Sequence, residues 1–181
     1  VITGDSVIFA GEDLWESIDP NNIRCTAIPG DDTTNFEKRL LDTVLIYQPE
    51  VVYLHIGGND FIDRFVKQKP FDAHVIFDNI IKCIHIMKKS GVKKIFWMEI
   101  LPLGKTLEIL NKETLAFNML MRQESMKKFE FEVLPTRDVL ADKDGFIKEE
   151  YLGPDSIHCI KKAYTEAWVP QFKNSVEQFL N

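Results

Sequence analysis

The sequence predicts a single α/β domain built around a mostly parallel sheet. Short apolar and β-branched runs alternate with longer stretches in which apolar residues recur at helical spacing, and this alternation is typical of successive strand–helix–strand units. The run VVYLHI, residues 51–56, is nearly all apolar, as expected of a strand that helices cover on both faces. A length of 181 residues suits one domain with a substantial core, so we expect a single domain over residues 1–181.

Five segments are expected to form the strands of this sheet. In chain order they are Val1–Thr3, Ile23–Ile28, Val51–Ile56, Lys94–Ile100 and Phe131–Leu134. In an open α/β sheet, ligands bind beyond the carboxyl ends of the strands. The residues that directly follow each strand are therefore the first place to look for a functional site.

Helical patterns fill the gaps between these strands. The helix after the second strand is expected to begin at 32–34, where Thr34 and Glu37 can form a capping box, and its apolar positions are Phe36, Leu40, Val44 and Tyr47. The next helix presents one apolar face and ends at the signal Ser90-Gly91; that face carries Ile76, Ile80, Ile84 and Met87.

Two further helices complete the pattern. One is expected over about 111–128, with Leu115, Met119 and Met126 facing inward. The last is expected over roughly 159–180, and Pro170 should break or kink it because proline lacks a backbone N–H.

Composition narrows the classes of protein that this chain can belong to. The formal net charge is -6 and the isoelectric point is near 5.3, which argues against a dedicated nucleic-acid-binding protein because such proteins cluster Lys and Arg on one face. No stretch approaches the roughly 20 apolar residues of a membrane span, so we expect a soluble protein. The chain begins at Val1 within an apolar segment, a start that is compatible with removal of a leader or upstream domain, so both a cytoplasmic and a secreted location stay open.

The cysteines indicate neither a disulfide framework nor a metal site. They are three in number and far apart, at Cys25, Cys83 and Cys159. We expect buried free thiols, and we expect no metal and no cofactor.

Polar residues follow the predicted strands in a way that suggests acyl-transfer chemistry. Each motif by itself is also typical of a turn or a helix cap, but together they place a hydroxyl, a carboxylate, an imidazole, an amide and several glycines at one sheet edge. The motifs are Gly4-Asp5-Ser6, Pro29-Gly30-Asp31-Asp32, Gly57-Gly58-Asn59-Asp60, Leu101-Pro102-Leu103-Gly104 and Asp155-Ser156-Ile157-His158.

A serine hydroxyl becomes a nucleophile when a base takes its proton, and the base works best when a third group fixes its tautomer. Ser6, His158 and Asp155 suit these three roles. His158 is favoured because it follows a strand end and has a carboxylate nearby, whereas His55, His74 and His85 fall inside predicted elements. The oxyanion of a tetrahedral intermediate needs aimed donors, for which backbone N–H groups in glycine turns and the Asn59 amide are candidates.

Four of these motifs, in this order and across nearly the whole chain, resemble the blocks of the SGNH (GDSL-type) hydrolase superfamily: Gly4-Asp5-Ser6, the glycine at Gly30, Gly57-Gly58-Asn59-Asp60, and Asp155 with His158. The segments QPEVVYLHIGGND and ILPLGK resemble small acylhydrolases of the platelet-activating-factor acetylhydrolase type. The resemblance implies a three-layer, flavodoxin-like fold with a five-stranded parallel sheet of order 2-1-3-4-5. It also implies a Ser6 nucleophile, a His158 base oriented by Asp155, and an oxyanion hole from the Ser6 and Gly30 N–H groups and the Asn59 amide. Three positions depart from the usual pattern, at Val7, Ala27 and Ala163.

The expected activity is hydrolysis of a short-chain ester, foremost an acetyl ester of a sugar or small alcohol. Phe61, Phe65, Leu103 and Leu107 could line an acyl pocket or simply cover the core, and short loops indicate a shallow site. Two alternatives stay open: a lysophospholipase or thioesterase with the same triad, and a flavodoxin-like binding module without catalysis. The natural ester and the oligomeric state are left undetermined.

Overall fold

A computed structural model of the chain describes residues 1–67, 72–128 and 130–180. Its sheet has four parallel strands in the order β1-β2-β3-β4. The expected α/β class is confirmed, but the expectation of five strands in the order 2-1-3-4-5 is wrong for the part of the chain described here, because the segment expected as the second strand does not form one. The strands are β1 (Ile2–Gly4), β2 (Val51–His55), β3 (Lys94–Met98) and β4 (Glu132–Leu134).

The segment expected as a strand at 23–28 runs beside β1 without forming a regular strand. Ile2 N–H donates to the Arg24 carbonyl at 3.0 Å, and Thr26 and Ile28 N–H donate to the carbonyls of Ile2 and Gly4 at 3.0 and 2.9 Å, but a single parallel bridge, Ile2 to Cys25, is formed. The Thr26 carbonyl instead accepts from side chains, at 2.9 Å from Arg39 Nη1 and at 3.3 Å from Thr3 Oγ1. Because these side-chain bonds occupy a carbonyl that a ladder would use, the pairing does not continue.

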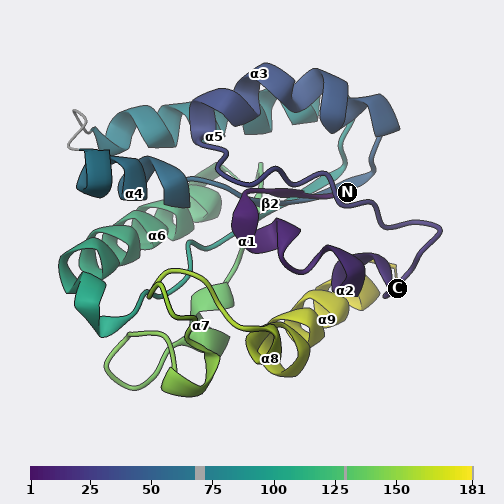
Figure 1. Cartoon of the computed structure of the whole chain (residues 1–181). Coiled ribbons are helices and arrows are strands. Elements are labelled where there is room, and N and C mark those ends of the chain that lie inside the picture. Colours follow the sequence, from purple (N-terminus) through teal and green to yellow (C-terminus); the bar gives the residue numbers. More distant parts are fainter. Residues whose placement is uncertain (68–71, 129, 181) are drawn as a thin grey trace.

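Helices cover both faces of the sheet (Figure 1). One face carries α3 (Thr33–Thr43), α4 (Gly58–Lys67), α5 (Ala73–Lys89) and α6 (Glu108–Lys128); α3 and α5 lie along the top of the view, and α6 lies below α4 at the left. The opposite face carries α1 (Ser6–Phe9), α2 (Glu12–Glu16), α7 (Thr136–Leu140), α8 (Lys161–Ala163) and α9 (Val169–Leu180). Short 3-10 turns lie at Leu45–Tyr47, Lys105–Leu107 and Glu149–Tyr151.

The two faces of the sheet follow from the two-residue period of a strand. Val52, Leu54 and Trp97 join the core under α3 to α6, whereas Tyr53 and Phe96 join the core on the opposite face. The last two rings stack with centroids 4.7 Å apart. Buried apolar side chains on both faces explain why the run at 51–56 contains so few polar residues.

The helix ends and inner faces differ in part from expectation. Helix α3 is capped by Asp32, whose carboxylate accepts from Asn35 N–H at 2.7 Å, so the capping box of Thr34 and Glu37 is wrong. The predicted apolar face of α5 is buried, which confirms the prediction. Of the apolar positions predicted for α3, Phe36, Leu40 and Val44 are buried, but Tyr47 is 54% exposed, so its assignment to the inner face is wrong.

Helix α6 turns a different face inward from the one predicted. Leu115, Met119 and Met126 are exposed, so the predicted inner face is wrong. The inner positions include the polar Asn111, Thr114 and Asn118, which are buried among apolar neighbours. Asn118 explains the difference, because its amide bonds both the N–H and the carbonyl of Ile100, at 3.1 and 2.8 Å.

The C-terminal helical region is continuous but irregular. A π-helical turn at Tyr164–Trp168 separates α8 from α9, and Pro170 follows it in the first turn of α9. A π turn just before a proline is one way for a helix to accommodate the missing N–H. The three cysteines are buried free thiols, as predicted.

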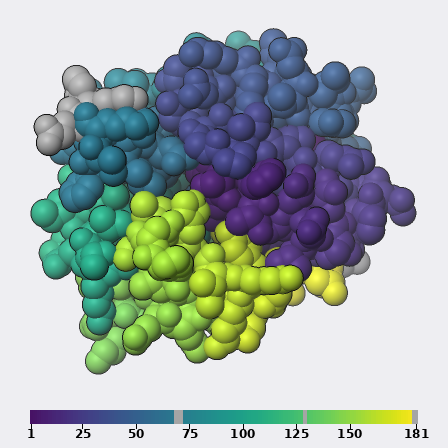
Figure 2. Space-filling view, in the orientation of Figure 1, coloured from purple at the N-terminus to yellow at the C-terminus, as the bar shows by residue number. Residues whose placement is uncertain are grey.

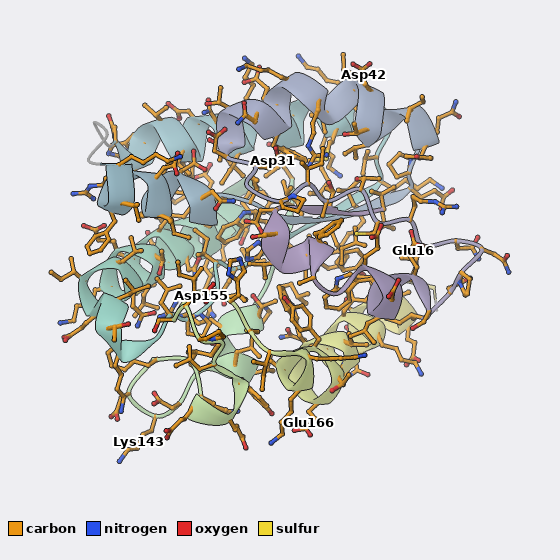
Figure 3. All side chains as sticks on the ribbon, in the orientation of Figure 1. Glu16, Asp31, Asp42, Lys143, Asp155 and Glu166 are labelled. Atoms are coloured by element: carbon orange, nitrogen blue, oxygen red, sulfur yellow. The ribbon has the colours of Figure 1, made fainter. Side chains whose placement is uncertain are left out.

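Charged side chains lie mostly on the outside of the molecule, where Glu16, Asp42, Lys143 and Glu166 project in Figure 3. Across the described ranges, no helix combines the length and apolar character needed to cross a membrane.

Candidate active site

Ser6 lies where β1 passes directly into α1. Gly4 at the end of β1 has φ of +146°, and a Cβ on it would lie 1.9 Å from the His55 carbonyl oxygen, so only glycine allows this turn. Asp5 then caps α1 by accepting from Val7 N–H at 3.0 Å. Its carboxylate also accepts from Nδ1–H of the buried His55 at 3.2 Å. The nucleophile candidate therefore starts a short helix whose cap is held by a second histidine.

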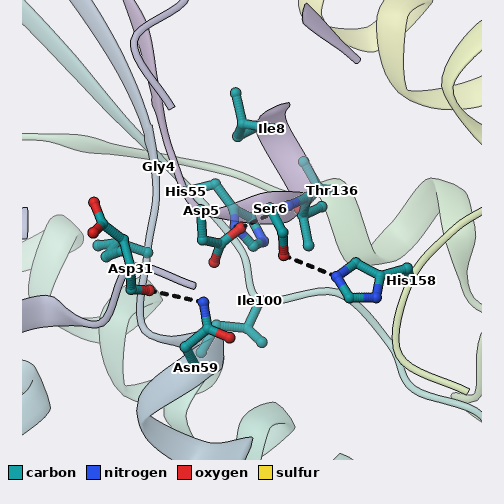
Figure 4. A network of polar contacts seen from close by, with 12 residues as sticks. Gly4, Asp5, Ser6, Ile8, Asp31, His55, Asn59, Ile100, Thr136 and His158 are labelled. Carbon is teal, nitrogen blue, oxygen red and sulfur yellow. Dashed lines mark hydrogen bonds and ion pairs between the residues drawn. The ribbon is translucent and has the colours of Figure 1, made fainter. Parts of the chain in front are cut away.

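Ser6, His158 and Asp155 form a continuous hydrogen-bonded chain. The Ser6 hydroxyl lies 2.8 Å from His158 Nε2, and His158 Nδ1–H donates to Asp155 Oδ2 at 2.6 Å. Figure 4 shows the Ser6 and His158 side chains pointing at each other. The space-filling view agrees, because the N-terminal purple atoms adjoin the yellow-green atoms of the loop near residue 155 (Figure 2). In this arrangement Nδ1 carries the proton and Nε2 is free to accept one from the serine.

Backbone hydrogen bonds close the loop that carries Asp155 and His158 and hold its middle. Gly153 N–H donates to the His158 carbonyl at 2.8 Å, and Gly104 N–H donates to the Ser156 carbonyl at 2.9 Å. Ser156 adopts φ of +63°, a left-handed conformation that costs roughly 1–2 kcal/mol in a residue other than glycine. The Asp155 carboxylate on this loop reaches Nδ1 of the His158 ring.

The Asp155 carboxylate is stabilised as an anion. Burial acts to raise its pKa, but hydrogen bonds from the His158 ring and from the N–H groups of His158 and Ile157 outweigh burial and lower the pKa to about 2. Asp155 is thus ionised at every pH at which a histidine base works. It can orient the His158 ring and balance the charge of the imidazolium.

The turn that contains Gly30 is linked to Asn59 through Asp31. Pro29 and Gly30 form the middle of a turn that Asp31 N–H closes on the Ile28 carbonyl at 3.2 Å; Gly30 has φ of +82°, as a type II turn requires at this position. The turn bond does not use the Gly30 N–H. Asn59 Nδ2 donates to the Asp31 carbonyl at 2.8 Å (Figure 4), and its second hydrogen is left for another acceptor.

A small cavity adjoins these groups. Its volume is about 30 Å³, which is room for roughly two groups of the size of a water molecule. Its polar wall includes Ser6, Asn59, Thr114 and His158. Its apolar wall includes Ile62, Ile100, Leu103, Leu110 and Ile157.

Of the four residues expected to line an acyl pocket, one lines the cavity beside Ser6 and three lie elsewhere. Leu103 lines the cavity. Phe61 is buried against the Phe117 ring with centroids 5.4 Å apart, Phe65 is 50% exposed, and Leu107 packs against the core; none of these three lines the cavity. Sequence reasoning missed Leu110 and Thr114, because the loop between β3 and α6 had to be placed before either could be assigned.

The described residues contain no group of three or more metal-ligating side chains of the His, Cys, Asp or Glu type. What they do bring together is a hydroxyl, an imidazole and a carboxylate in series, with an amide and a glycine turn alongside. These groups can transfer a proton from Ser6 and can hydrogen-bond a developing oxyanion.

Comparison with known proteins identifies the fold. No protein-family model and no curated protein sequence matches the chain. Among solved structures, a candidate acylhydrolase from Bacteroides fragilis superimposes with a TM-score of 0.84 at 13% identity, over 99% of this chain and 86% of that one. A GDSL-like lipase from Bacteroides thetaiotaomicron gives 0.78 at 15% identity, over 98% and 86% of the two chains.

A variant of an acetyl xylan esterase from Geobacillus stearothermophilus gives a TM-score of 0.75 at 16% identity, over 94% of this chain and 92% of that one. At these identities the likeness establishes the fold. The chain therefore has the α/β fold of GDSL-type acylhydrolases, as the sequence blocks predicted.

Proposed function

We propose that this protein is a carboxylic ester hydrolase of the SGNH type that works through a covalent acyl-serine. The observation that carries the proposal is the hydrogen-bonded series from Ser6 through His158 to Asp155, with 2.8 Å and 2.6 Å between the donor and acceptor atoms. The fold shared with acylhydrolases and an acetyl xylan esterase supports the same class of reaction. A binding protein would have no need for this series at the sheet edge.

In the first half of the reaction, Ser6 Oγ attacks the ester carbonyl while His158 Nε2 takes the hydroxyl proton. Collapse of the tetrahedral intermediate expels the alcohol, which receives that proton from His158. In the second half, His158 takes a proton from water as the water attacks the acyl-serine, and the acid leaves with Ser6 reprotonated. Asp155 keeps the His158 ring in one tautomer throughout, and none of these steps requires a metal or cofactor.

The oxyanion of each tetrahedral intermediate would be bound by three donors: the backbone N–H groups of Ser6 and Gly30, and the Asn59 amide. The amide is already oriented by its bond to the Asp31 carbonyl. A donor that needs no reorganisation during the reaction is worth on the order of 100- to 1,000-fold in rate.

The substrate we favour carries a short acyl group, foremost acetyl. A cavity of about 30 Å³ next to Ser6 and Asn59 can take the carbonyl and methyl of an acetyl group, but not the additional carbons of a long chain unless the wall moves. The alcohol portion would lie toward solvent, since the His158 and Asp155 side chains are 39% and 46% exposed.

Labelling with a fluorophosphonate probe tests the nucleophile. We expect one adduct in the wild-type protein and none in Ser6→Ala, with peptide mapping placing the adduct on Ser6. A protein that is folded but unlabelled, or an equally strong adduct in Ser6→Ala, contradicts the assignment and favours the non-catalytic binding module.

A series of p-nitrophenyl esters from acetate to decanoate tests the acyl preference. We expect kcat/KM to be highest for acetate and to fall from butyrate onward. A maximum at long chains would instead favour a lysophospholipase, and a preference for acyl thioesters over matched oxygen esters would favour a thioesterase.

A further inference from the structure

Arg39 of α3 reaches three backbone segments with one guanidinium group. Its Nη2 donates to the Gly4 carbonyl at 3.0 Å and its Nη1 to the Thr26 carbonyl at 2.9 Å. Its Nε forms an ion pair with the Asp31 carboxylate. A second bond from Nη1, to Thr43 Oγ1 at 2.9 Å, fixes the side chain to its own helix. The guanidinium thus joins the end of β1, the segment beside it and the turn after that segment.

Each of these three segments leads to a proposed oxyanion donor. Gly4 lies two residues before Ser6, and Thr26 enters the turn that presents the Gly30 N–H. Asp31 closes that turn on Ile28 and, through its own carbonyl, holds the Asn59 amide. The distances among the three donors therefore depend on contacts that meet at Arg39.

The site around Arg39 is built for a guanidinium rather than for a simple positive charge. The Arg39 and Asp31 side chains are 12% and 9% exposed, and the guanidinium carbon lies 5.0 Å from the centroid of the Phe36 ring. Burial raises the pKa of Asp31, and the hydrogen bond and charge of Arg39 oppose that rise. A lysine ammonium is a point charge on a flexible stem and cannot keep three divergent donors in one plane.

We propose that Arg39 is a positioning residue for the oxyanion hole, which fixes the spacing of the Ser6, Gly30 and Asn59 donors without touching the substrate. This role rests on the proposed esterase function. It differs from a general contribution to stability because it acts on the transition state, where the oxyanion forms, more than on substrate binding.

The first experiment compares Arg39→Lys with the wild-type protein on p-nitrophenyl acetate, with kcat expressed per titrated active site. We expect kcat to fall on the order of 10-fold or more, with KM changed by less than about 2-fold, because a small displacement of preorganised donors is costly in rate. Arg24→Lys is the matched control. Arg24 belongs to the segment 23–28 beside β1, but its side chain is 54% exposed and pairs with Glu16 at 3.7 Å. The kcat of Arg24→Lys should therefore be unchanged.

The second experiment is a double-mutant cycle with Asn59→Ala. If Arg39 acts through the oxyanion donors, the loss in Arg39→Lys/Asn59→Ala is smaller than the product of the two single losses. Multiplicative losses, or an unchanged kcat in folded Arg39→Lys, would overturn the role. Asp31→Asn weakens the same ion pair from the Asp31 side and should also lower kcat with little change in KM. This variant replaces Arg39→Lys in the test if the Arg39 variants do not fold.

The two proposals fail in different ways. A wild-type protein that hydrolyses no ester and takes no fluorophosphonate at Ser6 overturns the esterase function and the role of Arg39 with it. An active, labelled wild type whose Arg39→Lys and Asp31→Asn variants keep full kcat overturns the role of Arg39 alone.

Discussion

Replacing Leu110 with alanine should change the acyl-chain preference of the proposed esterase while leaving its chemistry in place. Leu110 lies in α6, is 1% exposed and lines the cavity of about 30 Å³ beside Ser6. The substitution removes three carbon atoms from the wall, which is space for the two methylene groups that distinguish butyryl from acetyl. Burial of two methylenes contributes about 1.6 kcal/mol. The ratio of kcat/KM for butyrate to that for acetate should therefore rise roughly 10- to 20-fold.

The assay is steady-state hydrolysis of p-nitrophenyl acetate and butyrate, together with thermal unfolding. Loss of a buried leucine costs about 2–5 kcal/mol, which in a domain of this size corresponds to a lower Tm by about 4–20 °C. Leu40→Ala is the control, because Leu40 is fully buried in α3 and does not line the cavity. It should lower Tm by a similar amount without changing the substrate ratio. An unchanged ratio in folded Leu110→Ala, or an equal change in Leu40→Ala, would refute the assignment of this cavity to the acyl group.

Three further predictions concern the site itself. Asn59→Ala should lower kcat by about 100-fold or more with little change in KM; a loss confined to KM would show that Asn59 holds the substrate in its ground state. His158→Ala should lose nearly all turnover with only a small fall in Tm, because its side chain is 39% exposed and its removal takes away one hydrogen bond to Asp155; a large fall in Tm would contradict a mainly catalytic role. Asp155→Asn should lose on the order of 10,000-fold in kcat. Because the folded-state pKa of Asp155 is lowered to about 2, its stabilising effect is present above pH 4 and is lost as pH falls toward 2; urea unfolding should find the variant less stable than wild type at pH 6 and equal to it near pH 2.

Part of the candidate site could be predicted from sequence because the motifs at Ser6 and Asn59 follow strands β1 and β2. Parallel strands end at one edge, which places Ser6 and Asn59 beside the same cavity, and His158 was distinguished by its nearby carboxylate. The pairing of Ser6 with His158 spans 152 positions; it was predicted from the base that a serine nucleophile needs and from the resemblance to SGNH hydrolases.

The inner face of α6 could not be predicted, because hydrophobic periodicity assumes that apolar residues face the core. Here the inward positions include Asn111 and Asn118, whose amides bond the backbone of the loop after β3: Asn111 Oδ1 accepts from Leu103 N–H at 2.9 Å, and Asn118 binds Ile100. A loop without regular backbone pairing needs such partners. No pattern of hydrophobicity contains that information.

The expected fifth strand was wrong for a related reason. Residues 23–28 have the composition of a strand and lie beside β1, but Arg39, thirteen positions after Thr26, takes up the carbonyl that pairing would use. The deciding contact is between a side chain and the backbone at a distance in sequence. The cavity beside Ser6 shows the same dependence, because Leu110 and Thr114 line it only once α6 has been docked.

The contact between Ser6 and His158 has a consequence for how activity arises during synthesis. A chain still leaving the ribosome exposes its serine long before it contains the base, and 152 positions separate the two. An incomplete chain that ends before His158 lacks the base and cannot form an acyl-serine by the proposed route. Ester hydrolysis would therefore report that translation has passed residue 158 and that the loop carrying His158 has docked onto the N-terminal segment.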